Sequence, residues 1–334
     1  MYEVQSDNGA QAAVAEPSVK AARLRTRPWL KIASLITLGT AGSLTLLIGA
    51  ASYTLSGILI RPRLKRLPHL KRPHLKSLMH RIGVAFEEVI ICSFDDTKLY
   101  GWWMRAGADA PTVVVLHGVN NNRTSVIRAS LVLRQAGFNV LVFDGRAHGD
   151  SEGRYVTYGF YERRDVETAI EWLIAEKGID RECIGLAGES MGAAIALQVA
   201  AHLPWIRAVW ADSPFASLRR VTGEYVRRVT GLPAAVLNPV LWSVIRVANY
   251  RGKFDVEQVS PLALAGQIEC PVFLVHGTKD DLIEVKHSEN IYDALTGKKE
   301  LWTVEGVTHA RSARRAKREY GDRLTGFFGE HLKK

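Results

Sequence analysis

The sequence predicts an α/β protein in which a doubly wound, mostly parallel sheet carries a helical insertion after its sixth strand and follows one N-terminal transmembrane helix. Short runs rich in β-branched residues alternate with amphipathic helical segments from about residue 85 onwards. An uncharged stretch of 29 residues precedes this region, and one long apolar segment interrupts the alternation. A chain of 334 residues is long enough for one large α/β domain with both additions.

The net charge of +10 is confined to the N-terminal arm. Residues 1–81 hold 13 Lys and Arg against 3 Asp and Glu, whereas residues 82–334 hold 31 of each kind and sum to zero. Nucleic-acid-binding domains concentrate basic residues on their folded surface, so this distribution argues against that class. The arm divides into a basic polar tail at 1–31, the uncharged stretch at 32–60 and a basic linker at 61–84.

Residues 32–60 are predicted to form a transmembrane helix, because about 20 apolar residues suffice to cross the hydrocarbon core of a bilayer. A cleaved signal peptide is the alternative, since the stretch contains GAAS, which fits a small-residue cleavage site. The apolar regions of signal peptides are only about 7 to 15 residues long. We therefore favour a retained single-pass anchor.

The linker after this stretch contains basic residues spaced by prolines and apolar residues: Arg61, Arg63, Lys65, Arg66, Lys71, Arg72 and Lys76. Each such charge beside a membrane gains about 1 kcal/mol from anionic headgroups, so we interpret the linker as a membrane-surface contact and expect no nucleic-acid partner. Five basic residues precede the span and eight follow it up to Arg81, which favours a cytoplasmic domain under the positive-inside rule. Single-span anchors also run the other way, and the side of the domain stays open.

The domain at 85–334 begins with a predicted hairpin at 89–106 that turns at Asp95 and Asp96. Six further strands are predicted at 112–118, 139–145, 183–188, 206–214, 271–277 and 300–306. Most of them end in Gly or a polar residue, as strands of a buried parallel sheet do. Ligands of such sheets bind at the carboxyl ends of the strands, so functional residues are expected there.

A long segment at 215–261 separates the strands at 206–214 and 271–277. It includes AAVLNPVLWSVIRVANY, which is apolar and predicted to be helical. Insertions of this length are often functional, and a lid over a pocket is one use. An additional pair of packing helices is the alternative interpretation, and both stay open.

The stretch GLAGESMGAAIA at 185–196 places Ser190 between Gly188 and Gly192. The pattern G-x-S-x-G also arises by chance, so its context decides what it means. A predicted strand precedes Ser190 and a predicted helix follows it. A sharp turn between strand and helix lifts a serine hydroxyl above a sheet, and flanking glycines avoid the steric clash that this turn creates.

A serine hydroxyl needs a base to become a good nucleophile, and the base needs an acid that orients it. Asp280 follows the predicted strand at 271–277, and His309 follows the predicted strand at 300–306. The chain order Ser190, Asp280, His309 fits a hydrolase in which acid and base lie on later loops of the sheet.

These residues carry a resemblance to a known family. The motifs GESMG, HGTKDD and GVTH within residues 85–330 resemble the α/β-hydrolase superfamily, and in particular its prolyl-oligopeptidase-like and serine-aminopeptidase-like branches. The whole chain resembles bacterial hydrolases that carry one N-terminal membrane span. The resemblance implies the α/β-hydrolase fold and a catalytic triad of Ser190, Asp280 and His309.

The resemblance also implies an oxyanion hole. Its loop is HGVNNN, where the family takes one amide from the residue after His-Gly, here Val119, and the second amide would belong to Met191. DGRAHGDSEG at 144–153 resembles a family segment with mainly structural roles. Two positions depart from the family pattern: Glu284 stands where Pro is common, and asparagines replace the HGGG of many esterases.

Alternatives to the acid are Asp281, which the family spacing His-Gly-x-x-Asp disfavours, and Asp212, a position used in some relatives. If Asp212 has a structural role instead of a catalytic one, it would cap the segment that begins at Ser213-Pro214. His117 and His276 precede glycines and are expected to organise loops, and His148 is expected to be buried.

We expect a membrane-anchored serine hydrolase that cleaves an ester, thioester or amide through an acyl-enzyme. The expected partner is a small-molecule or lipid-like acyl substrate, and the anchor and the apolar insertion favour lipid-like or acylated substrates. Two alternatives are a serine peptidase of the same fold and a catalytically silent binding protein at the membrane. No motif of the H-E-x-x-H type occurs and the three cysteines are widely spaced, so neither a metal, a cofactor nor a disulfide framework is expected.

Overall fold

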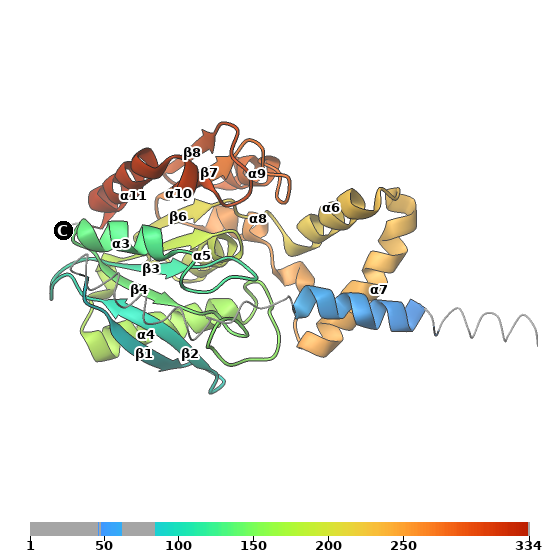
Figure 1. The fold of residues 1–334 in the computed structure, drawn as a ribbon, viewed down its shortest axis with the longest axis horizontal. Helices are drawn as coiled ribbons and strands as arrows, with labels where there is room; N and C mark the ends of the chain where they lie inside the picture. Colours follow the sequence, from blue (N-terminus) through green and yellow to red (C-terminus); the bar gives the residue numbers. More distant parts are fainter. Residues whose placement is uncertain (1–45, 47, 62–83, 333–334) are drawn as a thin grey trace, which may run out of the picture. The chain divides into compact units, whose positions relative to one another are not determined.

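The computed structural model describes residue 46, residues 48–61 and residues 84–332 (Figure 1). The chain divides into two compact units, 1–47 and 48–334, and the elements below belong to the second. The predicted tail at 1–31 and nearly all of the predicted linker lie outside the described residues, as does the first half of the predicted span.

Eight strands form one sheet in the order β1-β2-β4-β3-β5-β6-β7-β8. The strands are β1 (Glu87–Cys92), β2 (Lys98–Met104), β3 (Thr112–Leu116), β4 (Asn139–Phe143), β5 (Ile184–Glu189), β6 (Ala208–Asp212), β7 (Val272–Gly277) and β8 (Lys299–Val304). The β1–β2 hairpin is antiparallel and β2 joins β4 antiparallel, while every other pairing is parallel. The predicted mostly parallel, doubly wound sheet is confirmed.

Helices cover both faces of the sheet (Figure 1). The longer ones outside the insertion are α3 (Ile127–Gln135), α4 (Glu162–Lys177), α5 (Met191–His202), α9 (Lys286–Ala294) and α11 (Lys317–His331). The short ones are α8 (Pro261–Leu264), α10 (Ser312–Arg315) and the 3₁₀ turns η1 (Arg181–Cys183), η2 (Val256–Gln258) and η3 (Ala265–Gln267).

Alternation along β3 divides the core into two layers. Val114 and Leu116 pack with α4 and α5, whereas Val113 and Val115 pack with α3 and α11. Successive side chains of a strand point to opposite faces, so a strand covered on both faces must be apolar throughout. This explains why TVVVL is a nearly continuous apolar run.

The insertion after β6 is a pair of helices, α6 (Leu218–Thr230) and α7 (Ala234–Gly252). Ser217 caps the start of α6 by accepting a hydrogen bond from the Arg220 amide, and Gly231 ends the helix with a φ of 67°. The two helices contact each other. Their inner side contributes Leu218 and Ile245 to a third apolar cluster.

Residues 48–60 form a helix that contacts α7. Ser52 and Ser243 are joined by a 2.7 Å hydrogen bond between their hydroxyls, and the Arg251 guanidinium donates to the Tyr53 carbonyl and the Ser56 hydroxyl. Within the described part of the chain, no helix combines the length and apolar character needed to cross a membrane.

Candidate active site

Ser190 occupies the single residue between β5 and α5. Its backbone has φ 56° and ψ −115°, in the left-handed half of conformational space that a residue with a side chain rarely adopts. The Ser190 amide donates a 2.7 Å hydrogen bond to the Asp212 carbonyl on β6, which holds this conformation in place. The strained turn presents the hydroxyl at the carboxyl edge of the sheet, as the sequence pattern predicts.

The two glycines around Ser190 allow α5 to approach the sheet closely. A Cβ on Gly192 would lie 2.3 Å from the Leu116 carbonyl oxygen, and a Cβ on Gly188 would lie 2.3 Å from the Gly192 carbonyl carbon. Backbone atoms cannot yield to such contacts as a flexible side chain could. Both glycines therefore serve the close packing and the turn together.

The structure brings Ser190, His309 and Asp280 into one chain of hydrogen bonds. His309 Nε2 lies 2.8 Å from Ser190 Oγ, and His309 Nδ1 lies 2.7 Å from Asp280 Oδ2. Asp280 lies on the loop after β7 and His309 on the loop after β8. The neighbouring Asp281 is exposed, and Asp280 is the carboxylate that contacts the imidazole.

Asp280 is held as a carboxylate. Its Oδ1 accepts hydrogen bonds from the amides of Leu282 and Ile283, and Oδ2 faces both His309 and His276. Burial alone raises the pKa of the Asp280 carboxyl, but the hydrogen bonds from the two imidazoles and the Ile283 amide outweigh it and lower the pKa below its usual range.

The loop after β3 lies directly against the serine. A Cβ on Gly118 would be 3.2 Å from Ser190 Cβ and 3.7 Å from its Oγ, so the chain at Gly118 and Val119 borders the hydroxyl. On the other side Met191 begins α5, where the amides of the first turn have no intrahelical partner. The positive end of the helix dipole favours a developing anion at this place.

His117 fixes this loop and does not act as a base. Its Nδ1 donates to the Gly118 carbonyl and its Nε2 accepts from the Gly145 amide, at 2.8 and 2.9 Å. Burial lowers the pKa of His117 to about 4, so the ring is neutral at pH 7 and can accept from Gly145. Burial likewise lowers the pKa of His148 to about 4, and its Nδ1 donates to the Arg146 carbonyl.

The buried Asp212 forms an acid pair with the half-buried Glu189, which sequence reasoning missed. The two residues are direct neighbours across β5 and β6. Burial raises the pKa of Asp212 to about 6, and burial together with the charge of Asp212 raises the pKa of Glu189 to about 8. Asp212 accepts hydrogen bonds from the hydroxyls of Ser213 and Ser312, while Ser217 caps the helix α6 that follows.

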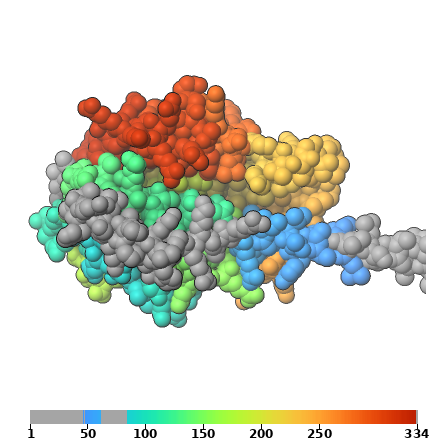
Figure 2. All heavy atoms as spheres, viewed as in Figure 1, coloured from blue at the N-terminus to red at the C-terminus, as the bar shows by residue number. Residues whose placement is uncertain are grey.

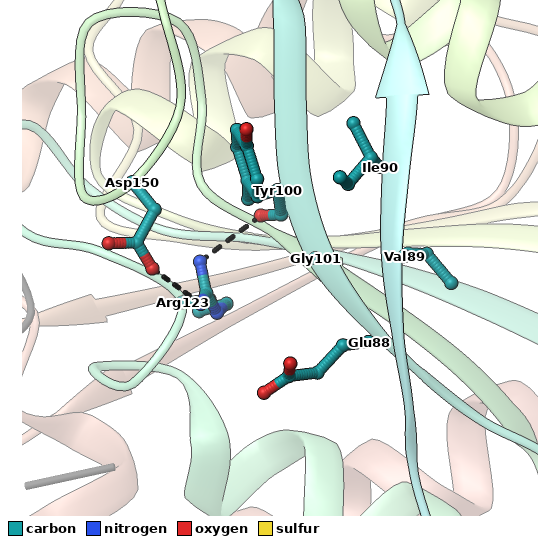
Figure 3. Close-up of a pocket in the computed structure, with 7 residues that line it drawn as sticks. All are labelled: Glu88, Val89, Ile90, Tyr100, Gly101, Arg123 and Asp150. Carbon is teal, nitrogen blue, oxygen red and sulfur yellow. Dashed lines mark hydrogen bonds and ion pairs between the residues drawn. The ribbon is translucent and has the colours of Figure 1, made fainter.

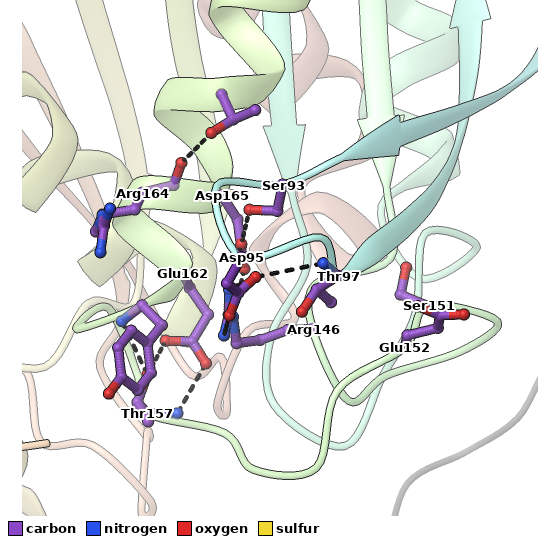
Figure 4. A network of polar contacts seen from close by, with 12 residues as sticks. Ser93, Asp95, Thr97, Arg146, Ser151, Glu152, Thr157, Glu162, Arg164 and Asp165 are labelled. Atoms are coloured by element: carbon purple, nitrogen blue, oxygen red, sulfur yellow. Dashed lines mark hydrogen bonds and ion pairs between the residues drawn. The ribbon is translucent and has the colours of Figure 1, made fainter. Parts of the chain in front are cut away.

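The segment at 144–153 supports the site through two ion-pair networks. Asp144 pairs with the Arg123 guanidinium and accepts from the backbone amides of Arg123 and Asp150. Arg146 pairs with Asp165 at 2.6 Å and with Asp95 at 3.1 Å (Figure 4). These contacts tie the loops after β4 and β1 to α4, which is the structural role that the resemblance implies.

A cavity of about 510 Å³ lies away from the triad, beside the β1–β2 hairpin. Its lining consists of Glu88, Val89, Ile90, Tyr100, Gly101, Arg123 and Asp150 (Figure 3). None of Ser190, Asp280 and His309 lines it. The cavity is therefore separate from the candidate active site.

Comparison with family profiles and protein sequences identifies proteins that this chain resembles. The profile of the Prolyl oligopeptidase family matches residues 124–334, which include all three residues of the triad. The Uncharacterized protein YqkD of Bacillus subtilis is 33% identical over 252 residues, covering 72% of this chain and 80% of that protein. Protein ABHD12B of Homo sapiens is 26% identical over 246 residues, covering 68% of this chain and 63% of that protein.

Comparison with solved structures identifies proteins whose fold this chain resembles. The Pyrococcus furiosus esterase Pf2001 superposes with a TM-score of 0.64 at 28% identity, covering 81% of this chain and 97% of the esterase. The Pyrococcus horikoshii acylaminoacyl peptidase superposes with a TM-score of 0.59 at 18% identity, covering 75% of this chain and 42% of the peptidase. The second match concerns the fold alone.

Proposed function

The chain belongs to the prolyl oligopeptidase family of α/β hydrolases, and from this premise we propose that it is a membrane-anchored hydrolase that cleaves an acyl bond with Ser190, His309 and Asp280. That the protein is a serine hydrolase follows from the family and is supported by the 28% identity to a solved esterase. The observation that supports these catalytic residues is the unbroken hydrogen-bond chain from Ser190 Oγ through the His309 imidazole to Asp280.

The proposed reaction begins when Ser190 Oγ attacks the carbonyl carbon of the substrate and its proton passes to His309 Nε2. Asp280, which stays ionised, accepts from His309 Nδ1 and stabilises the imidazolium. The tetrahedral oxyanion accepts hydrogen bonds from the amides of Val119 and Met191. Each such donor is worth about 2.7 to 4 kcal/mol in related chemistry.

The intermediate collapses when His309 returns the proton to the leaving oxygen, sulfur or nitrogen. The leaving group departs as an alcohol, thiol or amine, and an acyl-enzyme remains on Ser190. Water then attacks the acyl carbon, with His309 again taking the proton, and the free acid is released with Ser190 restored. Apart from the substrate, the reaction consumes only water.

An ester or thioester substrate is favoured over a peptide. The support is the 28% identity to an esterase, which spans 97% of that protein. Beyond the sheet and its helices, the described part of this chain adds the helix 48–60 and the α6–α7 insertion. A serine peptidase of the same fold is the second candidate, because the family profile itself describes peptidases.

The anchor in a bacterial cell membrane is proposed from the uncharged stretch at 32–60 and the basic linker that follows it. Carbonate extraction of membranes that contain the full chain tests it. The anchor proposal predicts that the chain stays with the membrane pellet, whereas release into the supernatant contradicts it.

Labelling of the full chain with a fluorophosphonate tests the nucleophile. We expect covalent labelling of the wild type and none of the Ser190→Ala variant, and labelling that survives this substitution contradicts the assignment. A panel of acyl esters graded by chain length, compared with aminoacyl amides, then separates esterase from peptidase. A wild type that resists the phosphonate and hydrolyses no member of the panel favours a silent binding protein.

A further inference from the structure

Exposed apolar side chains gather on two neighbouring elements. Among the described residues from 48 to 332, thirteen large apolar side chains are exposed, and eleven of them lie on the helix 48–60 or on α6–α7 and the turn between them. Those of the helix are Ile48, Tyr53, Leu55 and Ile58, and those of the insertion are Tyr225, Val229, Leu232, Val236, Val240, Trp242 and Tyr250. The other two are Ile90 on β1 and Leu282 on the loop after β7, outside these two elements. Single exposed apolar residues are ordinary, but a concentration of this kind marks an interaction surface.

The spacing within the insertion shows that apolar stripes face outwards. Tyr225 and Val229 are one helical turn apart on α6, as are Val236 and Val240 on α7. Val229 is 67% exposed and Trp242 is 54% exposed, so no described element covers them. An amphipathic helix of a globular domain normally turns its apolar stripe inwards. We name the exposed apolar residues of α6, α7 and their turn the insertion surface.

The charge of the insertion matches an anionic surface. Residues 215–252 hold six Arg and one Glu. Arg219, Arg220 and Arg228 pair with Glu257, Glu224 and Glu284, whereas Arg227 and Arg246 are exposed and form no ion pair among the described residues. The Arg246 guanidinium lies over the Trp242 ring, 5.0 Å from its centroid, which is within the range of a cation–π contact. Exposed Trp and Tyr beside Arg are the residue types that settle at the headgroup level of a bilayer.

The insertion also contacts the C-terminal part of the predicted membrane span. The stretch 32–60 would be about 44 Å long as a helix, whereas the hydrocarbon core is about 30 Å thick. A helix of this length can extend beyond the core at its last turns, and these are the turns that contact α7 through Ser52 and Ser243 and through Arg251. Figure 2 shows the helix 48–60 next to α6 and α7 at one end of this unit.

We propose that the insertion surface docks on the lipid bilayer, with its apolar stripes in the headgroup and upper acyl region and with Arg227 and Arg246 against anionic headgroups. The occupant is the membrane that holds the anchor, and the inference rests on the proposed anchoring. Cover by a second copy of the chain is the competing outcome, and the quenching experiment below distinguishes it from docking on lipid.

Docking would also bring the helix that begins after Ser190 close to the bilayer. Phe215 and Leu218 at the base of the insertion pack in one cluster with Ile60 and with Ala194, whose amide bonds to the Ser190 carbonyl one turn below it. The membrane-facing element and the nucleophile helix are thus connected by direct apolar packing. Acyl substrates that partition into the bilayer are the class that this arrangement brings to Ser190.

Lipid quenching of single labels tests the docking. The full chain carries Cys92→Ser, because Cys92 is exposed while Cys183 and Cys270 are buried. An environment-sensitive fluorophore is placed at Val240→Cys, at Leu44→Cys within the predicted span, or at Arg318→Cys on α11. Each protein is reconstituted into vesicles of phosphatidylcholine and phosphatidylglycerol, without quencher or with lipids that bear a doxyl group near the headgroup or deep in the acyl chain.

We expect the shallow quencher to lower fluorescence about twofold at position 240, as for a side chain at the headgroup boundary, and to leave position 318 unchanged. The deep quencher should act at position 44. Quenching at 44 but not at 240 overturns docking while the anchor stands, and quenching at neither overturns both. A blue-shifted emission at 240 without quenching shows cover by protein and also overturns the proposal. Fluorophosphonate labelling of the same samples reports the hydrolase separately.

A functional arm uses exposed positions that lie outside the catalytic machinery. The double variant Val229→Asp with Val240→Asp is compared with the matched control Ile90→Asp, on β1. We expect both variants and the wild type to hydrolyse a soluble short-chain ester equally, and the double variant to lose about tenfold against a long-chain ester held in vesicles. Equal activity of the double variant and the control on the vesicle substrate contradicts a role of docking in substrate entry.

Discussion

His276 Nε2 lies 3.3 Å from Asp280 Oδ2, the same carboxylate oxygen that His309 contacts. His276 is buried, its Nδ1 lies 2.7 Å from the Ser288 hydroxyl, and its Nε2 also donates to the Ile283 carbonyl. The imidazole thus connects β7, the loop that carries Asp280 and the start of α9. It is a positioning residue, because it touches the acid and not the reacting atoms.

Replacement of His276 by Ala is expected to lower kcat about tenfold with little change in KM. One donor to a charged carboxylate is lost, and a bond of this kind is worth roughly 1.5 to 3 kcal/mol, only part of which is felt at the transition state. Steady-state kinetics on a soluble ester measures the change in kcat and the change in KM separately. His276→Gln, which keeps a donor, should recover part of the rate, and an equal loss in both variants would indicate a purely structural role.

Asp280→Asn is expected to lower kcat by about 10⁴, because an amide cannot hold the His309 tautomer or stabilise its charged form. It should also change stability in a pH-dependent way. Hydrogen bonds lower the pKa of the folded Asp280, so its carboxylate stabilises the fold above the unfolded pKa of about 3.9, and this contribution disappears as the pH falls through the lower folded pKa.

Urea unfolding of wild type and Asp280→Asn between neutral and acidic pH checks this. The difference in the free energy of unfolding should be constant above about pH 5 and should narrow at lower pH. The exposed neighbour is the matched control, since Asp281→Asn should follow the wild type at every pH. A gap that widens on acidification would contradict the assignment.

Much of the candidate site could be predicted because chain order and sheet position are linked. Ser190, Asp280 and His309 each follow a parallel strand, and the carboxyl ends of parallel strands meet at one edge of the sheet. The short glycine-flanked turn defined the place of Ser190 still more closely. Local patterns therefore sufficed for the sheet, the insertion and the meeting of these three side chains.

Contacts that depend on strand register or on distant helices could not be predicted. Glu189 lies opposite Asp212 only because β5 and β6 pair in one register, and two acidic residues side by side run against the usual expectation for neighbours. The contact of residues 48–60 with α7 joins segments almost 200 residues apart through hydroxyl and arginine bonds. No periodicity in either segment carries that information.

Glu189→Gln is expected to stabilise the protein at alkaline pH. Burial raises the pKa of folded Glu189 to about 8, so between the unfolded pKa of about 4.3 and pH 8 the folded state keeps a proton that the unfolded state has lost. Stability therefore falls as the pH rises through this window. The glutamine variant lacks that dependence and should exceed the wild type at pH 9 by on the order of a few kcal/mol.

Thermal unfolding from about pH 5 to pH 9 measures the Glu189 effect. The control is Glu171→Gln, an exposed position on α4, which should track the wild type throughout. A constant difference between Glu189→Gln and the wild type across this range would mean that Glu189 ionises normally in the fold.

Gly192→Ala is expected to abolish ester hydrolysis and destabilise the fold by more than about 3 kcal/mol, as overpacking against rigid atoms does. The added Cβ would meet the Leu116 carbonyl at 2.3 Å and the His117 carbonyl at 2.8 Å, so α5 must move away from β3 and carry Ser190 with it.

Gly326→Ala on α11 is the matched control, because its Cβ would meet open space. That variant should gain about 0.5 to 1 kcal/mol from helix propensity and keep full activity. Denaturant unfolding and fluorophosphonate labelling of both variants test the pair, and a Gly192→Ala protein that labels at the wild-type rate would show that the close approach of α5 is not required for the turn.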